Sequence, residues 1–343
     1  MYLYIDPGTG SMLFTILLAA LGTLVYLLRN LKIRLGTMLS RNRRAEKADG
    51  AVPLVIYAEE KRYWTTFGPI CRELERRGQE TVYLTASPDD PVFRQGFARI
   101  HPEVIGKGNK AWSRLNFLKA KVVLATTPSL DVYQWKRSRD VSWYVHIPHA
   151  PNDVTRYRMF GIDYFDAVLL SGAYQMDQIR QLEKLRNLPA KELRLVGMPY
   201  LDGLREKLAS AEQTKNACRT VLLAPSWGES GILSRYGGAM IDALLKTGYH
   251  IIVRPHPQSF ESEKDMLSEL QKKYPDSDQL EWNGDADNFE ALRRSDILIS
   301  DFSGVIFDYT LVFDRPVLYA DTSFDKGPYD CWWLEEELWT FRI

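Results

Sequence analysis

Several common signatures of enzymes are missing from this sequence. The 343 residues include three cysteines, Cys71, Cys218 and Cys331, whose scattered positions suit neither a zinc site nor a disulfide framework, and this is typical of a reducing compartment. No Gly-rich dinucleotide fingerprint follows the first apolar strand and no GxxxxGK[ST] stretch occurs, which argues against a nicotinamide enzyme and a P-loop ATPase. "SWGES" does not fit GxSxG, so a serine hydrolase has little support.

Net charge is also lacking. The chain has 44 basic and 44 acidic residues and a formal net charge of zero, so nothing predicts attraction to nucleic acid, and no nucleic-acid partner is expected. With 45% hydrophobic and 26% charged residues, the composition is that of a folded protein. The length suffices for two α/β domains of ordinary size.

One long stretch near the N-terminus carries no charge. Residues 7–28, "PGTGSMLFTILLAALGTLVYLL", have the length of one transmembrane helix. The basic residues that follow are Arg29, Lys32, Arg34, Arg41, Arg43, Arg44 and Lys47. By the positive-inside rule, the pattern predicts a cell-membrane protein with a single N-terminal helix and a cytoplasmic catalytic body. A cleaved signal peptide would need its basic residues before the apolar run, whereas a re-entrant or interfacial helix stays an alternative because glycines interrupt the stretch.

The remainder alternates apolar strand patterns with amphipathic helix patterns. This alternation is the signature of parallel sheets with crossover helices, so the fold class predicted is α/β with two doubly wound parallel-sheet domains. The division expected is an anchor helix and basic linker over 1–50, an N-terminal acceptor domain over 51–205 and a C-terminal nucleotide-donor domain over 206–343. Ligands of such sheets bind beyond the carboxyl ends of the strands, which places the site in the cleft between the domains.

Polar turns follow several of the predicted strands. They are "HIPHAPND" with His146 and His149, "APSWG", "RPHP", and "SDFSG". The last lies between the strand "DILIS" and residues 305–316, which are predicted to form a helix or a long turn, with Ser303 as the N-cap. Free N–H groups at a helix start attract an anion, and phosphate is the usual one. The alternative is that Ser303 only caps the helix.

Two of these motifs together resemble a known family. "RPHP" (254–257) paired with "SDFSGVIFDY" (300–309) is similar to the CDP-glycerol glycerophosphotransferase family, the teichoic acid primases and polymerases, which have a GT-B architecture. "APSWG", "HAPND" and "GMPYLD" resemble further family turns. The chain departs from the family pattern at Gly304, where a second serine is usual, and at Tyr200, where arginine is usual.

The resemblance implies transfer of glycerol phosphate, or a related polyol phosphate, from CDP-glycerol or a similar nucleotide donor to a hydroxyl of a lipid-linked acceptor, with release of CMP. It implies His149 as the base and His256 as the group that assists the leaving CMP, with His146 as the alternative to His149. The residues expected to hold the donor are Arg254, Ser226, Asp301, Ser303, Gly304 and Asp308. Asp301 and Asp308 are expected to brace the turn or to contact a sugar hydroxyl. No metal and no cofactor are expected.

Two other functions stay open on the sequence alone. A GT-B glycosyltransferase or epimerase that uses a UDP-sugar would share the fold, the cleft and the phosphate turn. A membrane-tethered scaffold without catalysis would bind the donor and not turn it over.

Overall fold

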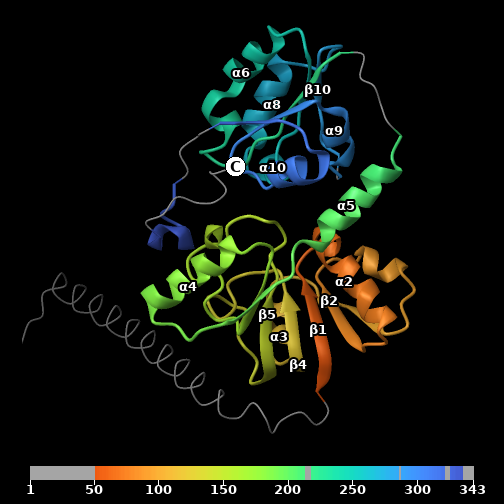
Figure 1. Ribbon diagram of the computed structural model, residues 1–343, viewed down its shortest axis with the longest axis vertical. Helices are drawn as coiled ribbons and strands as arrows, with labels where there is room; N and C mark the ends of the chain where they lie inside the picture. The colour runs from red at the N-terminus through yellow and green to blue at the C-terminus, as the bar shows by residue number, and fades with distance from the viewer. Residues whose placement is uncertain (1–50, 213–217, 286, 321–324, 335–343) are drawn as a thin grey trace, which may run out of the picture.

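Two parallel β-sheets form the framework of the protein (Figure 1). The computed structural model describes residues 51–212, 218–285, 287–320 and 325–334. The first sheet has seven strands in the order β3-β2-β1-β4-β5-β6-β7, and the second has five in the order β10-β9-β8-β11-β12. Every strand pairing is parallel, which confirms the predicted α/β class.

The strands follow the apolar runs of the sequence closely. The first sheet consists of β1 (Val52–Ala58), β2 (Thr81–Thr85), β3 (Ile100–Val104), β4 (Lys119–Ala125), β5 (Asp140–His146), β6 (Ala167–Leu170) and β7 (Glu192–Leu195). The second sheet consists of β8 (Thr220–Leu223), β9 (His250–Val253), β10 (Leu280–Trp282), β11 (Ile297–Ser300) and β12 (Val317–Tyr319).

Helices connect the strands. They are α2 (Trp64–Arg76), α3 (Asn109–Asn116), α4 (Tyr174–Arg186), α5 (Pro199–Ser210), α6 (Ile232–Leu245), α7 (Ser259–Ser262), α8 (Lys264–Lys273), α9 (Phe289–Arg294) and α10 (Val305–Asp308). Short 3₁₀ turns include η1 (Lys61–Tyr63), η3 (Val154–Arg156) and η5 (Asp330–Trp333), and α10 continues as the π-helical turn η4 (Tyr309–Phe313).

Both faces of each sheet are buried. In β1, Val55 and Tyr57 belong to one apolar cluster, and Ile56 and Ala58 belong to the cluster on the opposite face. Successive side chains of a strand point to opposite faces, so a strand covered on both sides needs an unbroken apolar run. Each large side chain buried in this way contributes about 1.5–3 kcal/mol, which explains why the strands were recognisable from their composition.

Strand β3 was not predicted. It lies at the edge of the first sheet, it contains Pro102, and its side chains are mostly exposed apart from Ile100. An edge position tolerates proline and polar side chains because one side of the strand has no partner. The apolar pattern used to find the other strands is therefore absent here.

The second half of the chain returns to the first half at its end. Asp330 is fully buried and accepts hydrogen bonds from the backbone N–H groups of Phe160 (2.6 Å) and Gly161 (3.1 Å). It also pairs with the guanidinium of Arg186 at 2.7 Å. The expected boundary between residues 205 and 206 falls within α5 and stays a prediction. Asp330, which this division assigns to the second domain, is bound by residues of the first half, and these donors offset the cost of burying its carboxylate.

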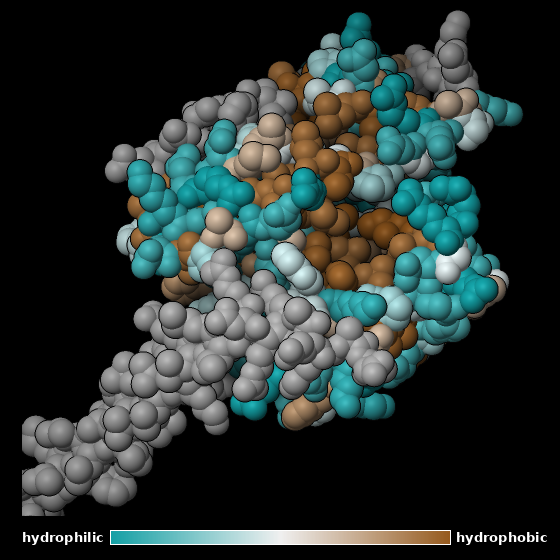
Figure 2. Space-filling model, turned by 60° about the horizontal axis from the view of Figure 1, so that its bottom comes forward, coloured by the Kyte–Doolittle hydropathy of each residue, from teal (hydrophilic) through white to brown (hydrophobic). Residues whose placement is uncertain are grey.

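The predicted membrane anchor, residues 7–28, and its basic linker lie outside the described residues. Across the ranges that the structure describes, no helix combines the length and the apolar character needed to cross a bilayer. Figure 2 shows apolar side chains gathered on the face that lies at the bottom of Figure 1, with polar residues around them. Phe117, which directly follows α3, is 80% exposed and is the most exposed of the large apolar side chains described.

Candidate active site

Each sheet has one point where the strand order reverses, and this point lies between β1 and β4 in the first sheet and between β8 and β11 in the second. Connections leave in opposite directions at such a point, so a crevice opens beyond the carboxyl ends of the two strands. In the first sheet the turn 59–63 follows β1, and Thr126 and Thr127 follow β4. In the second sheet "APSWG" follows β8, and "SDFSG" follows β11.

The turn after β5 meets the turn after β11. A Cβ atom at Gly304 would lie 3.2 Å from Asn152 Oδ1 and 3.6 Å from the Cβ of Ala150. The Arg156 guanidinium donates to the carbonyl oxygen of Phe302 and lies over the Phe302 ring at 5.1 Å. The two halves are thus in contact through two of the turns that the sequence singled out, and the glycine at 304 is explained by the close approach of Asn152.

A cavity of about 220 Å³ opens beside this contact. Its lining comes from the turn after β5, namely Pro148, His149, Ala150, Asn152, Asp153, Val154, Arg156 and Tyr157. A second cavity of about 120 Å³ lies at the ends of β1 and β2, and its polar lining includes Glu59, Glu60 and Lys107. Both cavities therefore lie beyond the carboxyl ends of first-sheet strands.

His149 is exposed to the first cavity although protein surrounds the rest of its ring. Its Nδ1 atom lies 3.2 Å from Thr126 Oγ1, and its ring is 5.1 Å from the Tyr63 ring. The surrounding protein disfavours the charged imidazolium, and the charge of Arg62 adds a repulsion, which together lower the pKa of His149 to about 4. The ring is neutral at pH 7 and able to accept a proton.

His146 is fully buried and does not line the cavity. Its Nε2 atom lies 2.9 Å from the hydroxyl oxygen of Tyr157, a cavity residue, and its ring packs edge-on against the same tyrosine. Burial, with a smaller contribution from His149, lowers the pKa of His146 to about 3. The alternative that His146 acts in place of His149 therefore has no geometric support, and His146 supports the cavity wall instead.

Asp301 joins the two turns of the second sheet. Its carboxylate is fully buried and accepts from the N–H of Ser226 at 2.8 Å and from the N–H of Ile232, the first residue of α6, at 3.0 Å. Burial raises the pKa of Asp301, and these hydrogen bonds oppose the rise. Both oxygens of Asp301 are thus engaged with backbone, as expected of a bracing residue.

Ser303 does not cap the following helix as predicted. α10 begins at Val305, its N-cap position is Gly304, and no side-chain hydrogen bond caps it. The regular helix is also shorter than the predicted 305–316, because it passes into a π-helical turn and ends at Asp314 in the left-handed region. The tight turn leaves Ser303 half-buried beside the contact with the first half.

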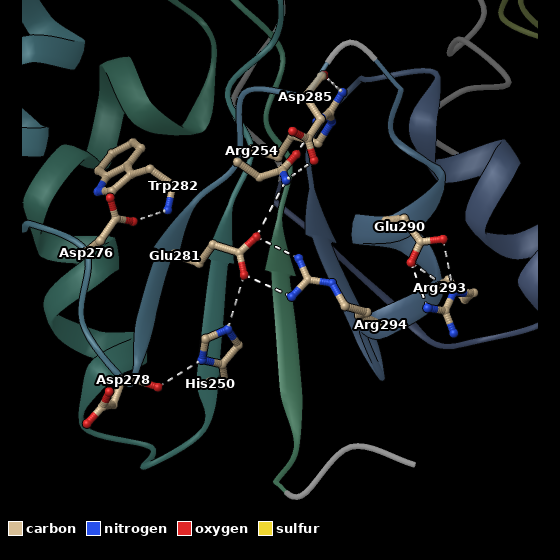
Figure 3. A network of polar contacts seen from close by, with 11 residues as sticks. His250, Arg254, Asp276, Asp278, Glu281, Trp282, Asp285, Glu290, Arg293 and Arg294 are labelled. Atoms are coloured by element: carbon tan, nitrogen blue, oxygen red, sulfur yellow. Dashed lines mark hydrogen bonds and ion pairs between the residues drawn. The ribbon is translucent and has the colours of Figure 1, made fainter. Parts of the chain in front are cut away.

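Arg254 is directed to the end of β10. One terminal nitrogen donates to the Asn283 side chain and the other donates to the carbonyl oxygen of Asp285 at 2.7 Å. Figure 3 shows Arg254 beside Asp285, in a network that also contains Glu281 and Arg294. β9 ends at Val253, so strand alternation does not place Arg254 and His256 on one side.

His256 has a defined tautomer. The backbone N–H of Gln258 donates to its Nδ1 atom at 3.1 Å, so the proton of the neutral ring resides on Nε2. Burial, and to a smaller extent the positive charge of Arg62, lowers the pKa of His256 to about 4. The negative charge of Glu263 acts in the opposite direction. The side chain therefore offers an N–H donor at neutral pH.

Asp308 faces α5 across the two halves. It accepts a hydrogen bond from the hydroxyl of Tyr200, the residue that stands where the family has arginine. Burial raises the pKa of Asp308 to about 6. The pair fixes the start of η4 against the helix that connects the sheets.

Sequence reasoning missed three groups near the cavity. Thr126 orients His149, Arg156 bridges to Phe302, and Arg62 acts electrostatically on both His149 and His256. Arg62 could have been found, because its turn follows β1 directly and β1 is the strand at which a doubly wound order reverses.

Residues 163–330 match the family model described as CDP-Glycerol:Poly(glycerophosphate) glycerophosphotransferase. The predicted family resemblance is confirmed over this region, which contains Arg254, His256 and the 300–309 turn. The turn with His149 lies before the matched region. No curated protein matches the chain.

Several solved structures share the fold of this chain. The UDP-GlcNAc 2-epimerase of Neisseria meningitidis bound to UDP-GlcNAc is 14% identical, with 80% of this chain and 84% of that chain covered and a TM-score of 0.54. MnaA of S. aureus with UDP is 11% identical, with 81% of each chain covered and a TM-score of 0.55. At such low identity these relatives indicate the GT-B-like fold alone.

Proposed function

We infer that this chain, an enzyme whose residues 163–330 mark it as a transferase of the CDP-glycerol glycerophosphotransferase type, moves glycerol phosphate from a CDP-linked donor to an acceptor hydroxyl. Transfer of glycerol phosphate in general follows from the family. The finer proposal is that the donor is CDP-glycerol or a related CDP-polyol, that CMP is released, and that the acceptor is a lipid-linked hydroxyl in cell-wall polymer synthesis.

One observation carries this proposal: the turn with His149 meets the "SDFSG" turn at Gly304 and Asn152, beside a cavity. Phosphoryl transfer depends on positioning and on charge stabilisation more than on covalent help from the protein. A base on one half and a donor-binding turn on the other meet this requirement when they are adjacent.

His149 is the proposed base. With Nδ1–H donating to Thr126 Oγ1, the Nε2 lone pair is available to take the proton of the acceptor hydroxyl. The hydroxyl oxygen then bonds to the β-phosphorus, and the bond from that phosphorus to the bridging oxygen breaks. The electron pair stays on the oxygen of CMP, so the products are a phosphodiester, CMP and one proton held by His149.

His256 is the proposed partner of the leaving group. Its Nε2–H, fixed by the Gln258 N–H at Nδ1, is able to donate to an oxygen of the departing phosphate. Asp301 and Ser226 keep the strand-end turns in register, as their buried hydrogen bond indicates. Arg254 donates to Asn283 and Asp285 and so holds the turn after β10. Its proposed role is to position that turn, and not to contact the donor.

The lipid-linked acceptor and the membrane setting rest on the sequence pattern of residues 1–50. An uncharged stretch followed by basic residues would hold the cytoplasmic body at the membrane, near an acceptor embedded there. The cavity at Glu59, Glu60 and Lys107 offers carboxylate oxygens and an ammonium group to the hydroxyls and phosphate of such an acceptor.

The test is CMP release by membranes that carry the full chain, with crude lipid extract as acceptor source and with CDP-glycerol, CDP-ribitol and UDP-GlcNAc as donors. His149→Ala and His256→Ala should each lose at least about a hundredfold in rate, the usual loss for a missing acid or base. His101→Ala is the matched control, because His101 is exposed on β3 and bound to Glu80.

Three results would contradict the proposal. UDP-GlcNAc turnover without CMP release would favour the sugar-nucleotide alternative. Donor binding without any turnover would favour the scaffold. Full activity of His149→Ala would leave the transferase class intact but remove the proposed base.

A further inference from the structure

We propose that the Arg62 guanidinium binds the diphosphate of the donor beside His149, at the junction of the two halves. This inference rests on the proposed function and names a residue that neither motif resemblance nor the matched region 163–330 includes. Arg62 would then be the cationic group that the chemistry requires at the diphosphate, in place of Arg254, whose terminal nitrogens are bound within the second half.

The fold places Arg62 at the reversal point of the first sheet. It lies in η1, in the turn that follows β1, and β1 pairs with β4, whose end carries Thr126. The Arg62 guanidinium lies over the Tyr63 ring at 5.1 Å and donates to the Tyr63 hydroxyl at 3.3 Å. The same tyrosine ring is 5.1 Å from the His149 ring. Tyr63 therefore contacts both the guanidinium of Arg62 and the ring of His149, and it links the two side chains.

The charge of Arg62 acts on both halves. Burial, and after it the positive charge of Arg62, lowers the pKa of His149 and of His256 to about 4. Glu263 is the charged group that opposes this at His256, and buried His146 lies behind His149. The geometry agrees: Tyr63 links Arg62 to His149, and the turn that carries His149 meets Gly304 of the second half. A ligand held at this junction is within the influence of Arg62, and a diphosphate is such a ligand in the proposed reaction.

The present partners of Arg62 leave it available for an anion. Its ion pair with Glu60, at 3.0 Å, joins two side chains that are 54% and 43% exposed. Exposed pairs of this kind contribute little to stability, so a bidentate phosphate contact can replace the pair at small cost. The neighbouring Lys61 also has an exposed partner, Asp89, but Arg62 is the residue that lies over the Tyr63 ring.

The proposal gives donor binding a second consequence. A diphosphate bound to Arg62 offsets its positive charge, so the repulsion that lowers the pKa of the two histidines diminishes. The pKa of His149 should then rise toward neutrality when the donor is bound, which makes it a better base in the complex than in the free enzyme.

The test compares Arg62→Gln and Arg62→Lys with Lys61→Gln, the adjacent charge removal in the same turn, in the full chain reconstituted in detergent. Calorimetric titration with CDP should show binding weakened at least about tenfold in Arg62→Gln, with partial recovery in Arg62→Lys. Binding of cytidine, which has no phosphate, should stay unchanged, and Lys61→Gln should behave as wild type. An equal loss for cytidine and CDP would indicate a structural role and overturn the proposal.

The pH profile of CMP release gives an independent readout. In wild type, the acidic limb of kcat should lie at higher pH than that of kcat/KM, because the first reports the complex and the second the free enzyme. Arg62→Gln should move the limb of kcat/KM to higher pH and narrow the gap. Identical limbs in wild type and Arg62→Gln would count against the proposal.

Failure of the two proposals is distinguishable. If wild type binds CDP or UDP but Arg62→Gln binds as tightly, the role of Arg62 is overturned and the proposed function stands. If wild type binds CDP and Arg62 is required but CMP is never released, the proposed function fails while the diphosphate site stands. If wild type binds neither nucleotide, both are overturned.

Discussion

The polar turns at the strand ends of the two sheets are placed alike and used differently. In the second sheet, two polar side chains beyond the strand ends turn inward: Asp301 binds the backbone of Ser226 and Ile232, and Arg254 binds the turn after β10. In the first sheet, His149 and Arg62 are exposed at the cleft and held by Thr126 and Tyr63. The motif that was easiest to recognise thus contributes largely to the framework, whereas the less recognisable side carries exposed reactive groups.

The largest effect on stability should come from removing an inward-turned side chain of the second sheet. Asp301→Ala leaves the buried N–H groups of Ser226 and Ile232 without their acceptor, at a cost of about 1–3 kcal/mol each. Urea unfolding followed by tryptophan fluorescence should show this loss, and Asp301→Asn should lose less because its amide oxygen still accepts. Unchanged stability in Asp301→Ala would mean that the carboxylate acts on the ligand instead.

Substitutions beside the exposed residues of the first sheet should lower activity and leave the free energy of unfolding unchanged. Thr126→Val removes the hydroxyl that orients His149 and keeps the side-chain shape, so the rate of CMP release should fall about tenfold through kcat. Thr127→Val is the matched control, because Thr127 donates to Glu59 and not to His149. Equal losses in both variants would show that the effect is not specific to the histidine.

The burial of Asp308 beside Tyr200 predicts a pH dependence of the free energy of unfolding. The pKa of Asp308 is raised to about 6, so the folded state binds its proton more tightly than the unfolded state. The contribution of this group to stability therefore falls as pH rises from about 4 to about 6. Asp308→Asn should remove that fall and unfold at a higher urea concentration than wild type at pH 7.

Asp330, whose pKa is also raised to about 6, remains in both proteins, so only the difference between their pH profiles reports Asp308. Parallel profiles would contradict the assignment.

The smallest effect on activity should come from a substitution at Gly304, where the two halves are in contact. Gly304→Ser would place a Cβ atom 3.2 Å from Asn152 Oδ1, which requires a shift of a few tenths of an ångström. We expect the KM for the donor to rise a few-fold, within about 1 kcal/mol, with little change in kcat. Combination with Asn152→Ala should restore the KM, and a decrease in KM on Gly304→Ser alone would argue that a serine contacts the donor here.

What the sequence could predict follows from the range of the interactions. Apolar runs predict strands β1 and β8, because a strand that is buried on both faces needs apolar side chains at adjacent positions. The direction of Arg254 depends on Asn283 and Asp285, which are distant in the chain, and no local pattern encodes that contact. His149 was found by its place after a strand, while Arg62 was missed because a charged turn after β1 resembles no motif.

The two halves are linked at α5 and again where Asp330 binds the backbone of Phe160 and Gly161. In Figure 1, α5 and residues 325–334 lie on opposite sides of the molecule. Two attachments define an axis, and rotation about that axis is the rigid-body motion that stretches neither attachment. A relative rotation of the two halves about this axis would therefore stretch neither link, and its reversal would return Asn152 to the same partner, Gly304, without a search over orientations.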